Sequence, residues 1–171
     1  MTIRPATAQD IPAITAIYNE VVANSNAVWT EKQDSEADRL AWMQARQALG
    51  YPVLVAVDDT TVLGYGTFGD FRAWPGYRYS VEHSVYIGKD YRGRGLGRLI
   101  VEELVTAATA LGKHVLIAGI DGSNEASLRL HAQMGFVEVA RMPEIGRKFG
   151  RWLDLVFMQR MLDAPGAARA D

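Results

Sequence analysis

The sequence of 171 residues contains no cysteine. Disulfide bonds, thiolate nucleophiles and cysteine-based zinc sites are therefore excluded, and so is any group transfer through an acylated cysteine. Histidine is scarce as well. The three histidines, His83, His114 and His131, do not form the H-E-x-x-H pattern of zinc hydrolases, so we expect no metal site.

A strong charge of one sign and long apolar runs are also missing. The net charge of −2 gives no overall attraction to nucleic acid. No apolar run is long enough to span a bilayer, and the first residues, 1–5, lack the apolar core of a signal peptide. We therefore expect a cytoplasmic protein that binds neither nucleic acid nor membranes.

The length suits a single domain with a sizeable core, which we place at residues 1–163. We find no internal repeat and no linker. The last residues, 164–171, offer nothing to bury and are expected to form a flexible tail.

The most informative segment is the glycine-rich run at 92–97, with the sequence RGRGLG. It follows an apolar strand-like run at 81–87 and precedes a helix-like run at 99–111. Glycines let the backbone approach a ligand closely, and the free N–H groups and dipole of a helix start favour an anion. Basic residues gather there as well: Lys89, Arg92, Arg94 and Arg98. The segment predicts a diphosphate site.

Two common phosphate-binding fingerprints do not fit. The P-loop string is absent, and the spacing of Gly93, Gly95 and Gly97 differs from the dinucleotide pattern G-x-G-x-x-G. The run at 64–69 does match that pattern, but aromatic residues and Pro75 follow it instead of a helix start. We interpret its glycines as strand residues before a loop.

Periodicity predicts the remaining elements. Helices are expected after Asp10, over 35–49, over 99–111 and from Asn124. Strands are expected at 2–4, 52–57, 62–68, 81–87, 114–120, from Phe136, and at 152–161.

The pattern Arg92-x-x-Gly95-x-Gly97 resembles motif A of the GNAT superfamily of N-acetyltransferases. The run Asn124-x-x-Ser127-x-x-x-His131, with Gly135-Phe136 after it, is similar to a later helix of that family. The opening residues, 3–6 and 10–11, resemble its first strand and helix, so the resemblance covers nearly the whole chain. Further segments resemble the group that acetylates phosphinothricin and methionine sulfoximine: 51–55, 69–72, 81–86 and 148–155.

The resemblance implies an α/β (α+β) fold, the GNAT fold, with a central mixed but mostly antiparallel sheet of about six to seven strands flanked by about four helices. It implies direct acetyl transfer from acetyl-coenzyme A to the α-amino group of a small amino acid, in a homodimer. Two alternatives stay open. One is the same fold acting on another amine, such as a protein N-terminus, a polyamine or an aminoglycoside. The other is a module that binds acetyl-coenzyme A without turnover.

For the cofactor, the resemblance implies contacts from the strand, the glycine loop and the later helix. The strand contributes backbone N–H groups that polarise the acetyl oxygen, freed where a bulge separates it from its neighbour. Asn124 and Ser127 could alternatively only cap their helix. The implied cofactor-binding residues are Val85, Tyr86, Ile87, Arg92, Gly93, Arg94, Gly95, Leu96, Gly97, Arg98, Asn124 and Ser127.

Glu82 is the candidate base. It lies in an otherwise apolar strand, where partial desolvation would raise the pKa of its carboxyl group, and the resemblance places a proton acceptor there. Tyr86 and His131 are the other implied catalytic residues. Many members of the family have a tyrosine where this chain has His131, so three interpretations stay open: a proton donor to the leaving thiolate, a packed histidine, or departure of the thiolate without an acid.

For the acceptor, the aromatic and basic loop at 69–79 suits the wall of a small-molecule pocket. Arg72 could form a forked bond with an α-carboxylate. His83 alternates with Glu82 along the strand, so a packed histidine is an open alternative to a substrate contact. Core packing is an equal alternative for Trp29. The implied substrate-binding residues are Arg72, Ala73, Trp74, Glu82, His83 and Trp29.

Overall fold

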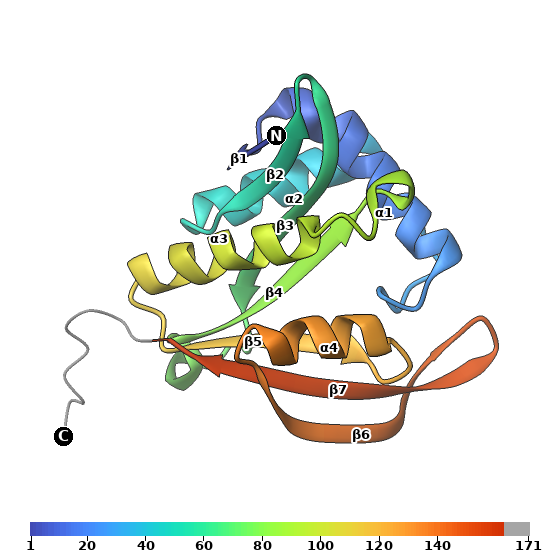
Figure 1. Cartoon of the computed structure of the whole chain (residues 1–171), viewed down its shortest axis with the longest axis vertical. Helices are drawn as coiled ribbons and strands as arrows, with labels where there is room; N and C mark the ends of the chain where they lie inside the picture. The colour runs from blue at the N-terminus through green and yellow to red at the C-terminus, as the bar shows by residue number, and fades with distance from the viewer. Residues whose placement is uncertain (163–171) are drawn as a thin grey trace.

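The computed structural model describes residues 1–162. Its centre is a seven-stranded sheet with the order β1-β2-β3-β4-β5-β7-β6 (Figure 1). The strands are β1 (Thr2–Pro5), β2 (Val53–Asp58), β3 (Thr61–Asp70), β4 (Ser80–Ile87), β5 (Val115–Asp121), β6 (Val137–Lys148) and β7 (Arg151–Met161). Every neighbouring pair is antiparallel except β4 and β5, which are parallel. The mixed, mostly antiparallel sheet expected from the sequence is confirmed, while the expected tail at 164–171 lies outside the described residues.

Four α-helices are present in residues 1–162, as expected: α1 (Ile11–Asn24), α2 (Glu36–Ala48), α3 (Leu96–Ala110) and α4 (Glu125–Gln133). Three short 3-10 helices accompany them: η1 (Ala8–Asp10), η2 (Pro75–Tyr77) and η3 (Lys89–Tyr91). Helices α3 and α4 lie in front of the sheet in Figure 1.

The core has two parts, one on each face of the sheet, because alternate side chains of a strand point to opposite faces. One part joins α1 and α2 to residues such as Val55 of β2 and Tyr65 of β3. The other joins α3 to Val81 of β4 and Leu116 of β5. The strands β2, β3 and β4 are therefore covered on both sides, whereas most residues of β6 are exposed.

Helix α3 begins at Leu96, three residues before the predicted start at Leu99. The residue at its N-cap is Gly95, with φ of 78°, a left-handed conformation that glycine adopts without a steric penalty. The glycine run is thus partly the first turn of the helix. The other glycine run, 64–69, lies inside β3, as predicted.

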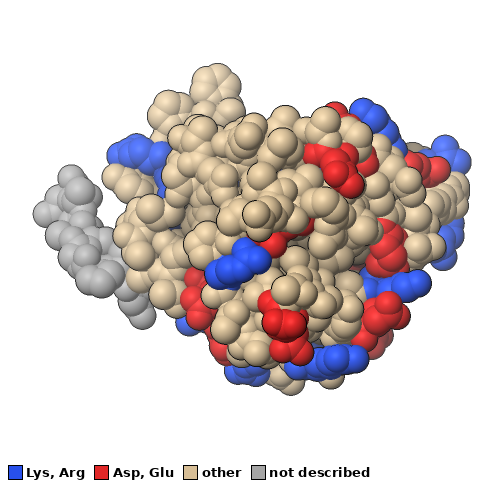
Figure 2. Space-filling model, turned by 90° about the horizontal axis from the view of Figure 1, so that it is seen from above, with Lys and Arg blue, Asp and Glu red and all other residues tan. Residues whose placement is uncertain are grey.

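None of the helices in residues 1–162 is long and apolar enough to cross a membrane. On the face shown in Figure 2, basic and acidic side chains are interspersed, as a net charge near zero would suggest.

Candidate functional site

The central feature of the site is a gap between β4 and β5. Their pairing runs from Ser80 with Val115 to His83 with Ala118 and then ends. On its other edge, β4 remains paired with β3 as far as Ile87, without a shift in register. The strands therefore diverge, as the resemblance implied, but the described part of β4 contains no bulge, so the gap arises because pairing with β5 stops.

The gap leaves backbone donors of β4 without a strand partner. Gly88, just after the strand, donates its N–H to the carbonyl of Leu63 on β3 at 2.9 Å. Backbone N–H groups alternate in direction along a strand, so those of Val85 and Ile87 point away from β3 and into the gap. Two donors on the same edge can bind the oxygen atoms of a ligand lying between the strands.

The glycine loop lies at the wide end of the gap. Gly93 and Gly95 have φ of 77° and 78°, and α3 starts directly after them. The N–H groups of the first turn of a helix have no partner within the helix, so those of Leu96, Gly97 and Arg98 are available to an anion. The loop therefore fits a diphosphate through its backbone.

The arginine side chains of the loop contact the protein itself. Arg92 Nη2 lies 2.5 Å from Glu20 Oε2 on α1, and its Nε donates to the carbonyl of Ile87 at 3.2 Å. Arg94 donates to the carbonyl of Asp90 at 3.1 Å, and Arg98 pairs with Glu102. Arg92 thus ties the loop to α1 and to the end of β4, a role that the local charge pattern did not indicate.

A cavity of about 830 Å³ connects the gap with the glycine loop. Most of the predicted site residues line it: Trp29, Glu82, His83, Val85, Tyr86, Ile87, Arg92, Gly93, Gly95, Leu96, Gly97, Arg98, Asn124, Ser127 and His131. Arg94, Arg72, Ala73 and Trp74 are not among the lining residues. The volume is that of a typical small-molecule site.

Asn124 caps its helix, which is one of the two interpretations that the sequence left open. Its side-chain oxygen accepts the N–H of Ser127 at 3.1 Å, which caps α4. Both residues also line the cavity. The cap therefore fixes the start of α4 at the edge of the cavity.

Glu82 points to the side of the sheet that α1 and α2 cover, next to β5. Its Oε1 would lie 2.6 Å from a Cβ atom at position 119, so Gly119 leaves the room that the carboxylate occupies. Burial raises the pKa of Glu82, while the positive charges of Arg72 and Arg46 lower it by less. A half-buried carboxylate with a raised pKa, facing a cavity, is suited to accept a proton.

His83 and His131 form a buried pair on the opposite side of the sheet. Their Nε2 atoms lie 3.2 Å apart, and His131 Nδ1 lies 2.8 Å from the carbonyl of Ser127. A carbonyl only accepts, so Nδ1 of His131 carries the proton, and its neutral Nε2 accepts the N–H of His83. His83 Nδ1 then has no partner among the described residues.

Both histidines are held in the neutral form. Burial, together with the charge of His131, lowers the pKa of His83 to about 3. Burial also lowers the pKa of His131, against the opposing effect of the Ser127 carbonyl. With each ring bonded to its neighbour, this geometry favours the packed interpretation of both residues.

Tyr86 lies on the same face as Glu82 and packs edge-on against Tyr18, with ring centroids 6.4 Å apart. Burial raises the pKa of its hydroxyl, while a hydrogen bond with Ser84 lowers it. The phenol therefore stays protonated at neutral pH and can donate a hydrogen bond into the cavity that it lines.

The loop at 71–79 stands apart from the cavity lining. The side chain of Trp74 is 76% exposed, and the guanidinium of Arg72 lies 5.0 Å from the centre of the Phe71 ring. Phe71 in turn packs edge-on against Phe157 of β7, at 5.8 Å. The charge of Arg72 lowers the pKa of Glu82, although Arg72 does not line the cavity.

Sequence reasoning missed one wall of the cavity. It consists of the end of α1 and the segment that follows, with Val21, Ser25, Ala27 and Val28, and of residues 119–121 of β5. The segment after α1 has no recognisable motif. The one available signal in β5 was Gly119, a glycine in an otherwise apolar strand.

Comparisons with known proteins agree with this geometry. Residues 1–137 match the family model described as an acetyltransferase (GNAT) domain. The chain is 51% identical to the L-methionine sulfoximine/L-methionine sulfone acetyltransferase of Salmonella typhimurium, over 99% of both chains. It is 39% identical to the phosphinothricin N-acetyltransferase of Alcaligenes faecalis, over 95% of this chain and 83% of that protein. A Salmonella typhimurium acetyltransferase solved with acetyl-coenzyme A superimposes with a TM-score of 0.93, at 50% identity and over 98% of both chains.

Proposed function

Because the chain belongs to the GNAT acetyltransferase family and is an N-acetyltransferase that uses acetyl-coenzyme A, we propose that it acetylates the α-amino group of small amino acids. The acceptors we infer are of the methionine sulfoximine, methionine sulfone and phosphinothricin type, which the names of the relatives describe. The observation that carries the proposal is the shared cavity. It joins an anion-binding loop, free strand donors and the half-buried Glu82 in one space.

The residues present fit acetyl-coenzyme A. The backbone N–H groups at 93–98 would hold the diphosphate, and Asn124 and Ser127 would contact the pantetheine arm. Bound acetyl-coenzyme A supplies an acetyl group as a thioester, from which the coenzyme leaves as a thiolate. One of the N–H groups of Val85 and Ile87 would bind the acetyl oxygen, whose negative charge grows during the transfer, and the other would be free for the pantetheine arm.

Glu82 would act as the base. An amino acid arrives as an ammonium ion, and the ammonium must lose a proton before its nitrogen can bond to the acetyl carbon. The carboxylate would take that proton, directly or through a water molecule, and the cavity around it has room for either. Gly119 supports this role because any larger residue there would displace the carboxylate.

For the leaving thiolate we favour a proton from Tyr86 or from water over one from His131. His131 is bonded at both ring nitrogens, and its lowered pKa keeps the imidazolium rare at neutral pH. We assign His131 and His83 instead to the packed wall of the cavity, on the far side of the sheet from Glu82.

Arg72 would bind the acceptor's α-carboxylate at the rim, with Trp29 and the neighbouring Ala73 and Trp74 shaping the entrance. Support comes from the aromatic and basic character of the loop at 69–79 and from the charge of Arg72, which lowers the pKa of Glu82. An amino acid has its amine and its carboxylate one carbon apart, so it matches a base and a guanidinium that lie near each other.

The test compares three acceptors: methionine sulfoximine, its carboxamide and spermidine. Loss of the charge-assisted bond should lower kcat/KM for the carboxamide by about 30- to 1,000-fold. Spermidine should be a poorer acceptor still, because Arg72 and Arg46 repel it. Equal rates for acid and amide, or a preference for spermidine, would contradict the amino-acid assignment.

We further propose a single domain over residues 1–163, a homodimer and a cytoplasmic location. A single sheet that takes strands from both ends of the described chain supports the single domain. Exposed apolar residues on β6 and β7 support the dimer. The use of acetyl-coenzyme A supports the location.

A further inference from the structure

Lys148, the last residue of β6, is a buried cation with three backbone partners. Only 1% of its surface is exposed. Its Nζ donates to the carbonyl of Val22 at 2.7 Å, of Ser25 at 2.6 Å and of Val28 at 2.7 Å. All three protons of the ammonium are therefore used, and all three acceptors lie more than 100 residues away in the sequence.

These carbonyls belong to one wall of the cavity. Val22 lies in the last turn of α1, where carbonyls lack partners within the helix and the helix dipole favours a cation. Ser25 and Val28 belong to the segment that follows, and residues 25, 27, 28 and 29 line the cavity. We call residues 25–31 the acceptor wall.

The hairpin of β6 and β7 contacts the acceptor wall at two further points. Gly146 lies against the ring of Trp29, and a Cβ atom on Gly146 would be 2.1 Å from a ring carbon. The N–H of Phe149 donates to Glu31 Oε1 at 3.1 Å. The hairpin therefore supports the acceptor wall from behind along much of its length.

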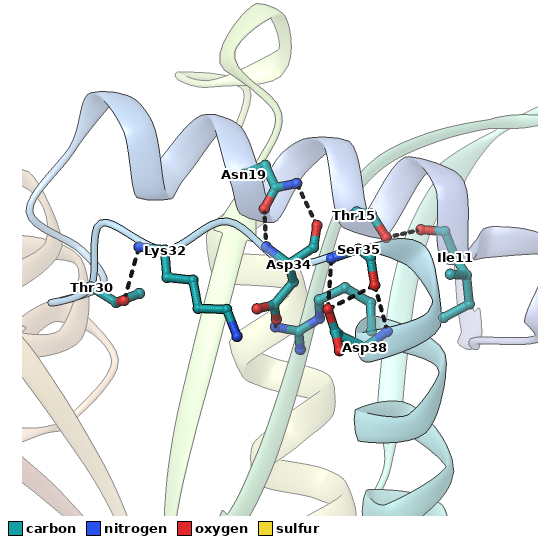
Figure 3. Close-up of polar contacts among 9 residues, drawn as sticks. Ile11, Thr15, Asn19, Thr30, Lys32, Asp34, Ser35 and Asp38 are labelled. Carbon is teal, nitrogen blue, oxygen red and sulfur yellow. Dashed lines mark hydrogen bonds and ion pairs between the residues drawn. The ribbon is translucent and has the colours of Figure 1, made fainter.

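The connection between α1 and α2 is held at its α2 end by other contacts. Figure 3 shows Asn19 of α1 bonded twice to the backbone of Asp34, at 2.8 and 2.9 Å, and Ser35 capping α2 with Asp38. These contacts do not involve the hairpin. A change at Lys148 would thus loosen the acceptor wall while leaving α1 and α2 attached to each other.

We propose that Lys148 is a positioning residue for the acceptor, because it fixes the acceptor wall, with Trp29, at the distance from Glu82 that the acceptor needs. This rests on the proposed function of the cavity. It also gives a physical role to the segment from Lys148 to Gly150. In the sequence, this segment was notable only because it resembles the corresponding segment of the group that acetylates phosphinothricin and methionine sulfoximine. The cofactor half of the cavity, built from β4, α3 and α4, has no contact with the Lys148 ammonium.

The test is steady-state kinetics of Lys148→Met, a substitution that keeps the length of the side chain and removes the charge and its donors. The three carbonyls lose their partner, and the acceptor wall moves to bring them to water. We expect kcat/KM for methionine sulfoximine to fall by about 10- to 100-fold, because small displacements near a reacting group have effects of that size. The KM for acetyl-coenzyme A should stay within about twofold, because the cofactor residues are untouched.

A second variant acts on the same wall without touching the ammonium. Gly146→Ala places a methyl group against the Trp29 ring and should push it toward the cavity. We expect the same pattern, a lowered kcat/KM for the acceptor with an unchanged cofactor KM. Lys32→Met is the matched control, since Lys32 is an exposed lysine of the same connection (Figure 3), and it should behave as wild type.

The outcomes separate the two proposals. A wild-type enzyme that acetylates no amino acid would overturn the proposed function and this inference with it. An active wild type whose variants Lys148→Met and Gly146→Ala keep the wild-type kcat/KM for the acceptor would overturn the positioning role alone. Equal losses of kcat/KM for the acceptor and for acetyl-coenzyme A would also overturn the positioning role, because they would indicate general destabilisation of the protein.

Discussion

At the scale of single residues, the environment of Glu82 leads to a prediction about pH. The carboxylate is the form that accepts a proton, and burial raises its pKa above the ordinary value of 4.5. The rate should therefore increase as the pH rises through that raised pKa, and it should be low at pH values below that pKa. Glu82→Gln should lower kcat by about 100-fold or more and abolish this ionisation, while acetyl-coenzyme A still binds. The measurement is a pH–rate profile of both proteins.

Glu103→Gln is the control for this experiment, because Glu103 is an exposed glutamate on α3, outside the cavity. It should keep the wild-type profile. Full activity of Glu82→Gln at neutral pH would show that another group is the base.

At the scale of elements, the glycine loop and the start of α3 predict how cofactor binding depends on Gly95. Its φ of 78° disfavours a β-branched residue, and the space beside its Cα holds no protein atom within 4 Å. The side chain of Gly95→Val would therefore occupy the place of the anion. The KM for acetyl-coenzyme A should rise by about tenfold or more, since a displaced anion loses its N–H donors.

Gly112→Val is the control that distinguishes the loss of the anion site from the effect of backbone strain. Gly112 follows α3, has φ of 68° and is also surrounded by open space. This variant should be destabilised in a thermal melt but should keep the cofactor KM. If both variants changed KM equally, strain alone would explain the effect of Gly95→Val.

The elements also show how far the sequence can predict. Strands and helices follow from local periodicity, and the glycine loop follows from its own sequence pattern. The fold class and a base at Glu82 were implied by the family resemblance. The roles of Lys148 and Arg92 could not, because their partners at Val22, Val28 and Glu20 come from distant parts of the chain. The neutral state of His131 was equally hidden, since it depends on the burial of the ring where α4 packs on the sheet.

At the scale of the whole molecule, the exposed apolar residues on β6 and β7 predict an interface between two copies of the chain. They are Val137, Val139, Met142, Ile145, Trp152 and Met161. Exposed apolar side chains gathered on neighbouring strands commonly mark a contact surface. Light scattering at micromolar concentration should give the mass of a dimer, about twice 18.8 kDa.

A pair of variants locates the predicted interface. Val137→Lys places a charge on β6, where the native side chain is 64% exposed, and should shift the protein toward monomers. Leu111→Lys changes a residue of 48% exposure at the end of α3 and should remain dimeric. A wild-type monomer would refute the dimer, and a dimeric Val137→Lys would place the contact elsewhere.

The gap between β4 and β5 also bears on how the protein unfolds. The strands before the gap and those after it share only the four register pairs from Ser80 with Val115 to His83 with Ala118, against seven between β3 and β4. The sheet thus has a seam, at which the two halves can separate most easily. A ligand that binds only the native state and fills this seam stabilises it by about 2.7 kcal/mol at a hundred times its Kd. Acetyl-coenzyme A would then join the two halves into one cooperative unit, and its concentration would decide whether they melt together or one after the other.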